Sequence, residues 1–215
     1  ESQFGPLSRV DLVTGETKSI SYQRLKPEMR WNWCAPIHVS VHNSDTIYHC
    51  GNIVVMSTNR GESWAEISPD LTTNDKTKMQ AGGKGGDGNI QYGTITTFDE
   101  SPLVPGLLWA GTDDGNVWVS RDNGKAWTKL NDKIAGNPGY WVSRVAASNF
   151  DPGTAYVSYT GLRNDDFRPY VYKTTDYGAS WTSLAGGLAE GPVNVIREDV
   201  KNPNLLFAGT DFGVH

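Results

Sequence analysis

The chain lacks the features that mark nucleic-acid-binding and membrane-spanning proteins. It has 19 Lys and Arg against 24 Asp and Glu, a net charge of −5, and no run of basic residues. A nucleic-acid-binding surface presents a basic patch or stripe, so we expect no nucleic-acid partner. No apolar stretch approaches the roughly 20 residues of a transmembrane helix, so we expect no membrane span in this segment.

Metal ligands are also scarce. The two cysteines, Cys34 and Cys50, do not have zinc spacing, and a structural zinc site needs four ligands. The four histidines show no paired ligand spacing; they are His38, His42, His49 and His215. The sequence therefore predicts no metal and no cofactor.

The sequence is compatible both with a disulfide between Cys34 and Cys50 and with two free thiols. Cys34 comes just before a predicted strand, and Cys50 ends the next strand, so antiparallel pairing would bring the two within a few residues of register. A bridge requires Cα atoms about 4.4–6.8 Å apart.

A sustained helical period is missing as well. Instead the chain has 24 Gly, 11 Pro and 8 Trp among its 215 residues. Frequent turn residues between short apolar stretches are typical of all-β proteins. We therefore predict an all-β fold in which aromatic side chains do much of the packing.

An eight-residue pattern, Ser/Thr-x-Asp/Asn-x-Gly-x-Ser/Ala-Trp, occurs three times, at 57–64, 120–127 and 174–181; we call it the box. Its acidic or amide residue can accept backbone N–H bonds within the turn, and its glycine permits positive φ. Its tryptophan starts the returning strand, and we expect the ring to be largely buried. The box thus predicts a structural hairpin made by Asn59, Gly61 and Trp64, by Asp122, Gly124 and Trp127, and by Asp176, Gly178 and Trp181.

Each box closes a unit with four predicted strands. Four antiparallel strands that recur every 50 to 60 residues or so describe a blade of a β-propeller. We assign blades to 31–72, 91–131 and 140–185, the outer strands of a preceding blade to 1–30, and the first strands of a further blade to 191–215. A propeller closes on itself to hide its sheet edges, so we expect the remaining blades on the same polypeptide.

The boxes resemble those of the Asp-box, or bacterial neuraminidase repeat, superfamily. Further segments resemble one branch of it, the large exported sortilin-like propellers of bacteria that are often labelled glycosyl hydrolases; these segments are 8–11, 31–33, 67–72, 110–115 and 205–210. The resemblance implies an extracytoplasmic location. It is a poor guide to function, because the box occurs in enzymes and in non-enzymes alike.

In a propeller the links from fourth to first strand and from second to third strand share one face, and long loops on a rigid scaffold favour function. The long links here are Ser68–Gln91, Asn131–Tyr140 and Thr160–Pro169. The candidate binding residues on this face are Trp33, Asp113, Asp114, Tyr140, Trp141, Arg163, Asn164, Asp165, Asp166 and Asp211. The aromatic members, together with Trp31, could stack on a ligand or pack between blades.

Two functions compete. The first is a non-enzymatic propeller that binds another protein or an extracellular ligand. The alternative is a glycoside hydrolase of xyloglucanase or sialidase type, with Asp113 and Asp165 as catalytic candidates. Such an enzyme needs two carboxyl groups about 5–5.5 Å or 6.5–9.5 Å apart. A sialidase would also need three arginines around the substrate carboxylate, and the predicted first strands supply two, Arg144 and Arg197.

Overall fold

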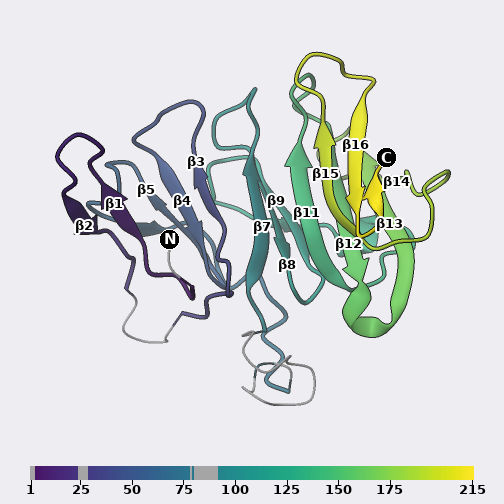
Figure 1. The fold of residues 1–215 in the computed structure, drawn as a ribbon, viewed down its shortest axis with the longest axis horizontal. Helices are drawn as coiled ribbons and strands as arrows, with labels where there is room; N and C mark the ends of the chain where they lie inside the picture. Colours follow the sequence, from purple (N-terminus) through teal and green to yellow (C-terminus); the bar gives the residue numbers. More distant parts are fainter. Residues whose placement is uncertain (1–2, 24–28, 78, 80–91) are drawn as a thin grey trace. The chain divides into compact units, whose positions relative to one another are not determined.

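The computed structural model describes residues 3–23, 29–77, 79 and 92–215. Two compact units, Glu1–Ile95 and Thr96–His215, divide the chain. Strands make up nearly all of the regular structure (Figure 1). In the described ranges, helix is limited to two single 3-10 turns, η1(Asn131–Lys133) and η2(Leu162–Asn164). The all-β prediction is confirmed.

The first unit holds a two-stranded hairpin and one four-stranded sheet. In the hairpin, β1(Ser8–Val10) pairs antiparallel with β2(Thr17–Ser19). The sheet has the order β3-β4-β5-β6 with antiparallel neighbours. Its strands are β3(Ile37–Val39), β4(Ile47–Cys50), β5(Val54–Ser57) and β6(Ala65–Glu66).

The second unit holds three further sheets, each in chain order. Two are four-stranded and one is three-stranded. The first comprises β7(Ile95–Glu100), β8(Leu108–Thr112), β9(Val117–Ser120) and β10(Thr128–Lys129). The second comprises β11(Trp141–Ala147), β12(Ala155–Gly161), β13(Asp166–Thr174) and β14(Thr182–Ser183), and the third β15(Val193–Glu198), β16(Leu206–Thr210) and β17(Gly213–Val214).

One of the predicted long links is shorter than expected. We predicted a loop over Thr160–Pro169, but β12 continues to Gly161 and β13 already begins at Asp166, where the two residues pair. Side-chain bonds to Asp166, described below, order the start of β13 and explain the difference. The result is one long hairpin with η2 at its tip.

The turn between first and second strands repeats in all four sheets. At the end of each first strand one backbone N–H bonds back across the turn, with N···O distances of 2.8–3.0 Å. The pairs are Ser40 to Thr46, Ser101 to Leu107, Ser148 to Thr154, and Asp199 to Leu205. These bonds fix which residues are equivalent from one first strand to the next.

The box turns are closed by side-chain oxygens. The hydroxyl at the first position accepts the N–H of the glycine at 2.8–2.9 Å in all three boxes. The oxygen at the third position accepts a backbone N–H four residues on at 2.9 Å, as in Asp176 with Ser180. Hydrogen bonds from Ser180 lower the pKa of Asp176 to about 2. Each turn therefore satisfies its own backbone donors.

The box glycines stand where no other residue fits. Their φ angles are +85°, +85° and +89°, which L-residues rarely adopt. A Cβ on Gly61 would lie 2.7 Å from the side chain of Ile20, and one on Gly178 would lie 2.7 Å from that of Leu130. Both of these apolar residues directly follow the outer strand of the preceding sheet. The glycine thus lets a box turn pack against the residue that follows the outer strand of the preceding sheet.

The box tryptophans are half-buried rather than largely buried as predicted. They precede the outermost strands of their sheets, β6, β10 and β14, so one side of the ring stays open. The rings still hold specific contacts. Trp64 Nε1 donates to the carbonyl of Ile20 at 2.8 Å, and Trp181 packs edge-on against Trp109 with ring centroids 6.3 Å apart.

The core of the second unit lies between its sheets. One cluster joins β8 and β9 to β11, β12 and β13, and the buried Trp109, Val119, Val142, Val157 and Tyr159 belong to it. A second cluster joins β11–β13 to β15 and β16. The middle sheet is therefore covered on both faces, which explains why β12 is buried along its whole length.

The disulfide left open by the sequence is not formed, and both cysteines are free. The Cys50 N–H bonds to the carbonyl of Pro36, so the β3–β4 pairing ends there. Cys34 lies two residues earlier, exposed in a turn, whereas the Cys50 side chain is fully buried. Burial raises the pKa of the Cys50 thiol.

Among the described residues, no helix is long and apolar enough to cross a membrane. In the same ranges, no group of three or more His, Cys, Asp and Glu side chains could hold a metal ion.

The burial of His49 should make the protein less stable in mild acid. Its ring is fully buried and stacks on Trp31 with centroids 4.4 Å apart, and burial lowers its pKa to about 4. As the pH falls from about 6.5, the unfolded histidine binds a proton while the folded one does not. We expect the free energy of unfolding to fall by about 3 kcal/mol by pH 4.

Urea denaturation at several pH values measures this effect. His49→Phe removes the titration and should flatten the pH dependence over this range, whereas His42→Phe, at an exposed position, should leave it in place. Parallel pH profiles for wild type and His49→Phe would contradict the assignment.

Candidate functional site

The loops of the second unit gather at one end of its sheets. Asn131 Nδ2 donates to the carbonyl of Gly115 at 2.9 Å, and a Cβ on Gly115 would lie 2.7 Å from the backbone of Gly139. The β8–β9 turn, which carries Asp113 and Asp114, therefore lies against the 131–140 link.

The β12–β13 hairpin joins the same surface. Gly191 donates its N–H to the carbonyl of Phe167 at 2.8 Å, and a Cβ on Gly191 would lie 3.1 Å from the ring of Phe212. The hairpin thus contacts the link after β14, and this link contacts the β16–β17 turn that carries Asp211. We call the surface of residues 112–116, 131–141, 161–168, 190–191 and 210–213 the loop face.

Two predicted aromatic positions, Trp31 and Trp33, belong to the first unit. The Trp33 ring packs edge-on against the Phe4 ring, with centroids 5.4 Å apart. Trp31 stacks on His49. Both rings therefore pack against other side chains. In the Ser68–Gln91 link, residues 78 and 80–91 lie outside the described residues.

Asp166 organises the loop face. Its carboxylate accepts bonds from Arg168 Nε at 2.9 Å, Arg168 Nη2 at 2.5 Å and the Tyr170 hydroxyl at 2.7 Å. The Tyr140 hydroxyl donates to it at 3.3 Å. The Asp166 side chain is 9% exposed. Hydrogen bonds from Arg168 hold the pKa of Asp166 well below its usual range. The carboxyl group is therefore ionised at neutral pH and has no proton to donate as a general acid.

The other predicted acids differ in burial and in their partners. Asp113 is buried and so is Asp114, whose carboxylate accepts the Thr112 hydroxyl bond at 2.5 Å. Asp211 accepts a bond from Asn194 Nδ2 at 2.6 Å. Asp165 sits at the hairpin tip, exposed and left-handed with φ +53°. The predicted catalytic pair, Asp113 and Asp165, thus consists of one buried and one exposed side chain.

The tip of the β12–β13 hairpin exposes apolar and cationic side chains next to the Trp141 ring. The Arg163 guanidinium lies 4.3 Å above the ring of Trp141, which is half-buried. Phe167 and Leu162 are 48% and 46% exposed, and the Arg168 side chain is 70% exposed. Asn164 is exposed beside them in η2.

Of the aromatic candidates, Tyr140 is a packing residue. Its ring lies edge-on to Tyr170 at 5.9 Å, and its hydroxyl is bound to Asp166. Sequence reasoning missed Arg168 and Tyr170. The signal was present, because residues 166, 168 and 170 alternate along one strand and so share a face.

Asp166→Asn should loosen the hairpin tip without unfolding the protein. The asparagine side chain carries no charge to pair with Arg168 and places an N–H₂ group among donors. We therefore expect the free energy of unfolding to fall by about 1–2 kcal/mol. The backbone N–H of Arg168, which donates to Asp166 at 3.1 Å in the wild type, should exchange faster. Asp165→Asn is the matched control, because asparagine tolerates the left-handed conformation. Hydrogen exchange measures the protection of the Arg168 amide. Equal protection in both variants would contradict this role of Asp166.

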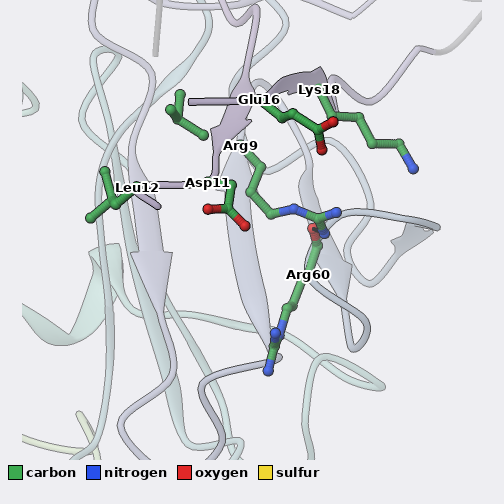
Figure 2. A pocket seen from close by; sticks show the side chains of 7 residues that line it. Arg9, Asp11, Leu12, Glu16, Lys18 and Arg60 are labelled. Atoms are coloured by element: carbon green, nitrogen blue, oxygen red, sulfur yellow. Dashed lines mark hydrogen bonds between the residues drawn. The ribbon is translucent and has the colours of Figure 1, made fainter. Parts of the chain in front are cut away.

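A shallow hollow of about 470 Å³ in the first unit offers no comparable surface. It is lined mainly by Arg9, Asp11, Leu12, Glu16, Lys18 and Arg60 (Figure 2). Arg9 and Lys18 both pair with Glu62, at 2.9 and 2.5 Å, and Arg60 pairs with Asp45 at 2.5 Å. These exposed pairs tie the β1–β2 hairpin and the first box to their neighbours, so their charges already have partners.

Comparison with known proteins shows the fold. No family model matches the chain, and no curated protein matches it significantly. Among solved structures it is similar to an ancestral GH74 enzyme (TM-score 0.62, 15% identity over 89% of this chain and 23% of that one). It is also similar to the GH74 enzyme of Niastella koreensis (TM-score 0.59, 20% identity, 80% of this chain and 24% of that one).

A third similar structure is YCF48 bound to a D1 peptide (TM-score 0.52, 13% identity, 98% of this chain and 60% of that one). The chain thus spans about a quarter of the GH74 enzymes and three fifths of YCF48. At these identities the likeness shows the fold alone. Together with the four-stranded antiparallel sheets, it establishes that the chain is a segment of a β-propeller.

Proposed function

We propose that this chain is part of an exported, non-enzymatic propeller whose loop face binds an extended segment of another protein or an extracellular ligand. The observation that carries the proposal is the contrast between two kinds of side chain on the loop face. The carboxylates of Asp114, Asp166 and Asp211 accept hydrogen bonds from neighbouring side chains, while Arg163, Phe167 and Leu162 are exposed at the hairpin tip beside the half-buried Trp141. We expect the partner to place an acidic and an apolar side chain against this tip.

The energetics favour a binding role. Arginine and tryptophan dominate the affinity of many interfaces, and the exposed Arg163 guanidinium stacks on the Trp141 ring. Trp141 lies at the start of β11, opposite Thr160, and Asp166 fixes the neighbouring strand end. Sites on such strand ends are held more precisely than sites on free loops.

We further propose that the chain belongs with the sortilin-like Asp-box propellers and that it is extracytoplasmic. The hydrogen-bonded box turns support the first of these assignments. Fractionation of cells that carry the tagged full-length protein tests the location. The YCF48 structure, bound to a D1 peptide, gives an example of a propeller with a peptide partner.

A peptide selection tests the binding function. Display libraries are selected against the chain, and the affinity of recovered peptides is compared between wild type and the double variant Trp141→Ala/Arg163→Ala. We expect a loss of about 2 kcal/mol or more, roughly thirtyfold in Kd. The matched control is Arg121→Ala/Tyr177→Ala, which removes a second cation–π pair of 4.1 Å from the box loops at the other end of β9 and β13.

The rival function, a glycoside hydrolase, is tested in parallel on a panel of plant and bacterial polysaccharides with the full-length protein. Asp165→Asn is the informative variant, because Asp165 is exposed and its replacement disturbs no turn bond. Turnover that this variant abolishes would replace the binding proposal. Absence of turnover, with peptide affinity lost in the loop-face variant alone, supports it.

A further inference from the structure

Three loops of the loop face meet at one glycine. Gly191, in the link after β14, donates its N–H to the carbonyl of Phe167 on the β12–β13 hairpin at 2.8 Å. A Cβ on Gly191 would lie 3.1 Å from the ring of Phe212, in the β16–β17 turn. Gly191 is itself buried. The two aromatic residues therefore flank a backbone segment that has no side chain to cover them.

Both aromatic side chains beside Gly191 are open to solvent. Phe167 is 48% exposed and Phe212 is 78% exposed. We call Phe167, Gly191 and Phe212 the apolar patch. Exposed apolar surface with a polar rim is typical of a site that binds another protein, so the polar residues around the apolar patch indicate what kind of partner it fits.

Charges of opposite sign adjoin the apolar patch. Arg163 comes four residues before Phe167, at the hairpin tip, and is exposed over the ring of Trp141. Glu190 directly precedes Gly191, is exposed, and forms no hydrogen bond or ion pair with any residue that the structure describes. Along the surface from the hairpin tip, Arg163 is thus followed by Phe167 and then by the link that carries Glu190.

We propose that the loop face binds a peptide segment in which an apolar residue stands between an acidic and a basic residue. The apolar side chain packs against Phe167 and Phe212 beside Gly191. The acidic residue faces Arg163, and the basic residue faces Glu190. Because charge complementarity at two separate points fixes the register of a ligand, the segment binds in one direction. This inference rests on the proposed function and narrows its partner to a peptide with both charges.

Peptide selection against the full chain tests the basic residue. Peptides are selected from one display library against wild type and against Glu190→Lys. We expect the wild-type pool to be enriched in a basic residue next to the apolar one, and the Glu190→Lys pool to carry an acidic residue at that position. Glu16→Lys makes the same charge change at an exposed position of the first unit, so it should select the same peptides as wild type.

Titration calorimetry with two peptides makes the exchange quantitative. The first peptide comes from the wild-type pool, and the second carries glutamate in place of its basic residue. We expect Glu190→Lys to weaken binding of the first peptide about fivefold and to strengthen binding of the second by a similar factor. Phe212→Ala should weaken binding of the first peptide about tenfold. It should melt like wild type, because the ring that it removes is mostly exposed.

Two results would overturn the inference and leave the proposed function in place. One is a first peptide that binds wild type, Glu190→Lys and Phe212→Ala equally well but loses affinity in Trp141→Ala/Arg163→Ala. The other is self-association of wild type that Phe212→Ala abolishes, because a second copy of the chain would then cover the apolar patch. Unchanged affinity in Trp141→Ala/Arg163→Ala would instead contradict the proposed function.

Discussion

Gly178→Ala is expected to lower the free energy of unfolding by about 3 kcal/mol. A left-handed conformation costs an L-residue about 1–2 kcal/mol, and forcing an extra methyl group into packed surroundings costs about 1–3 kcal/mol more. Both costs apply at Gly178, whose φ is +89° and whose added Cβ would lie 2.7 Å from Leu130 Cδ1. Leu130 is buried in the core cluster and has little room to move.

A second glycine separates the two costs. Gly187 has φ +98°, and nothing lies within 4 Å of its added Cβ, so Gly187→Ala should lose only the conformational part, about 1–2 kcal/mol. Urea denaturation of both variants gives the comparison. Equal losses would mean that the box glycine is not needed for the approach of neighbouring sheets.

Glu198→Ala should lower the free energy of unfolding by a similar amount, about 3 kcal/mol. The Glu198 carboxylate, at the end of β15, accepts bonds from the Ser148 hydroxyl at 2.9 and 3.0 Å, the Asn149 N–H at 2.6 Å and the Tyr156 hydroxyl at 2.9 Å. Ser148 and Tyr156 are themselves buried. A buried polar group that loses its partner costs about 1–3 kcal/mol, so the whole junction between the second and third sheets of this unit weakens.

Two variants make this prediction specific. Glu198→Gln keeps an acceptor oxygen and should lose about half as much, whereas Glu190→Ala, at an exposed position in the same unit, should change stability by less than about 0.5 kcal/mol. Thermal melting ranks the three. If Glu198→Ala and Glu190→Ala melt at the same temperature, the Glu198 carboxylate does not hold the two sheets together.

The sequence was sufficient for the features that local chemistry decides. The box turns follow from residues within eight positions of one another, so their hydrogen bonds could be predicted from the pattern around Asp122 or Asp176. The alternation of turn residues with short apolar stretches likewise predicts four strands per sheet. These features need no knowledge of distant contacts.

The site could be predicted only in part, because burial is set by the partner sheet. Nothing in the order Thr112-Asp113-Asp114-Gly115 says that both carboxylates turn inward, since aspartate before glycine is equally common in exposed turns. One of the hydroxyls that donate to Asp166 comes from Tyr140, 26 residues away.

We propose that the loop face binds a partner through Trp141 and Arg163 and catalyses no reaction. The most direct measurement is the Kd of a selected acidic, apolar peptide for wild type, for Trp141→Ala/Arg163→Ala and for Arg121→Ala/Tyr177→Ala, by titration calorimetry. We expect affinity to fall roughly thirtyfold in the first variant and Kd to stay unchanged in the second. Equal affinity in all three proteins would contradict it.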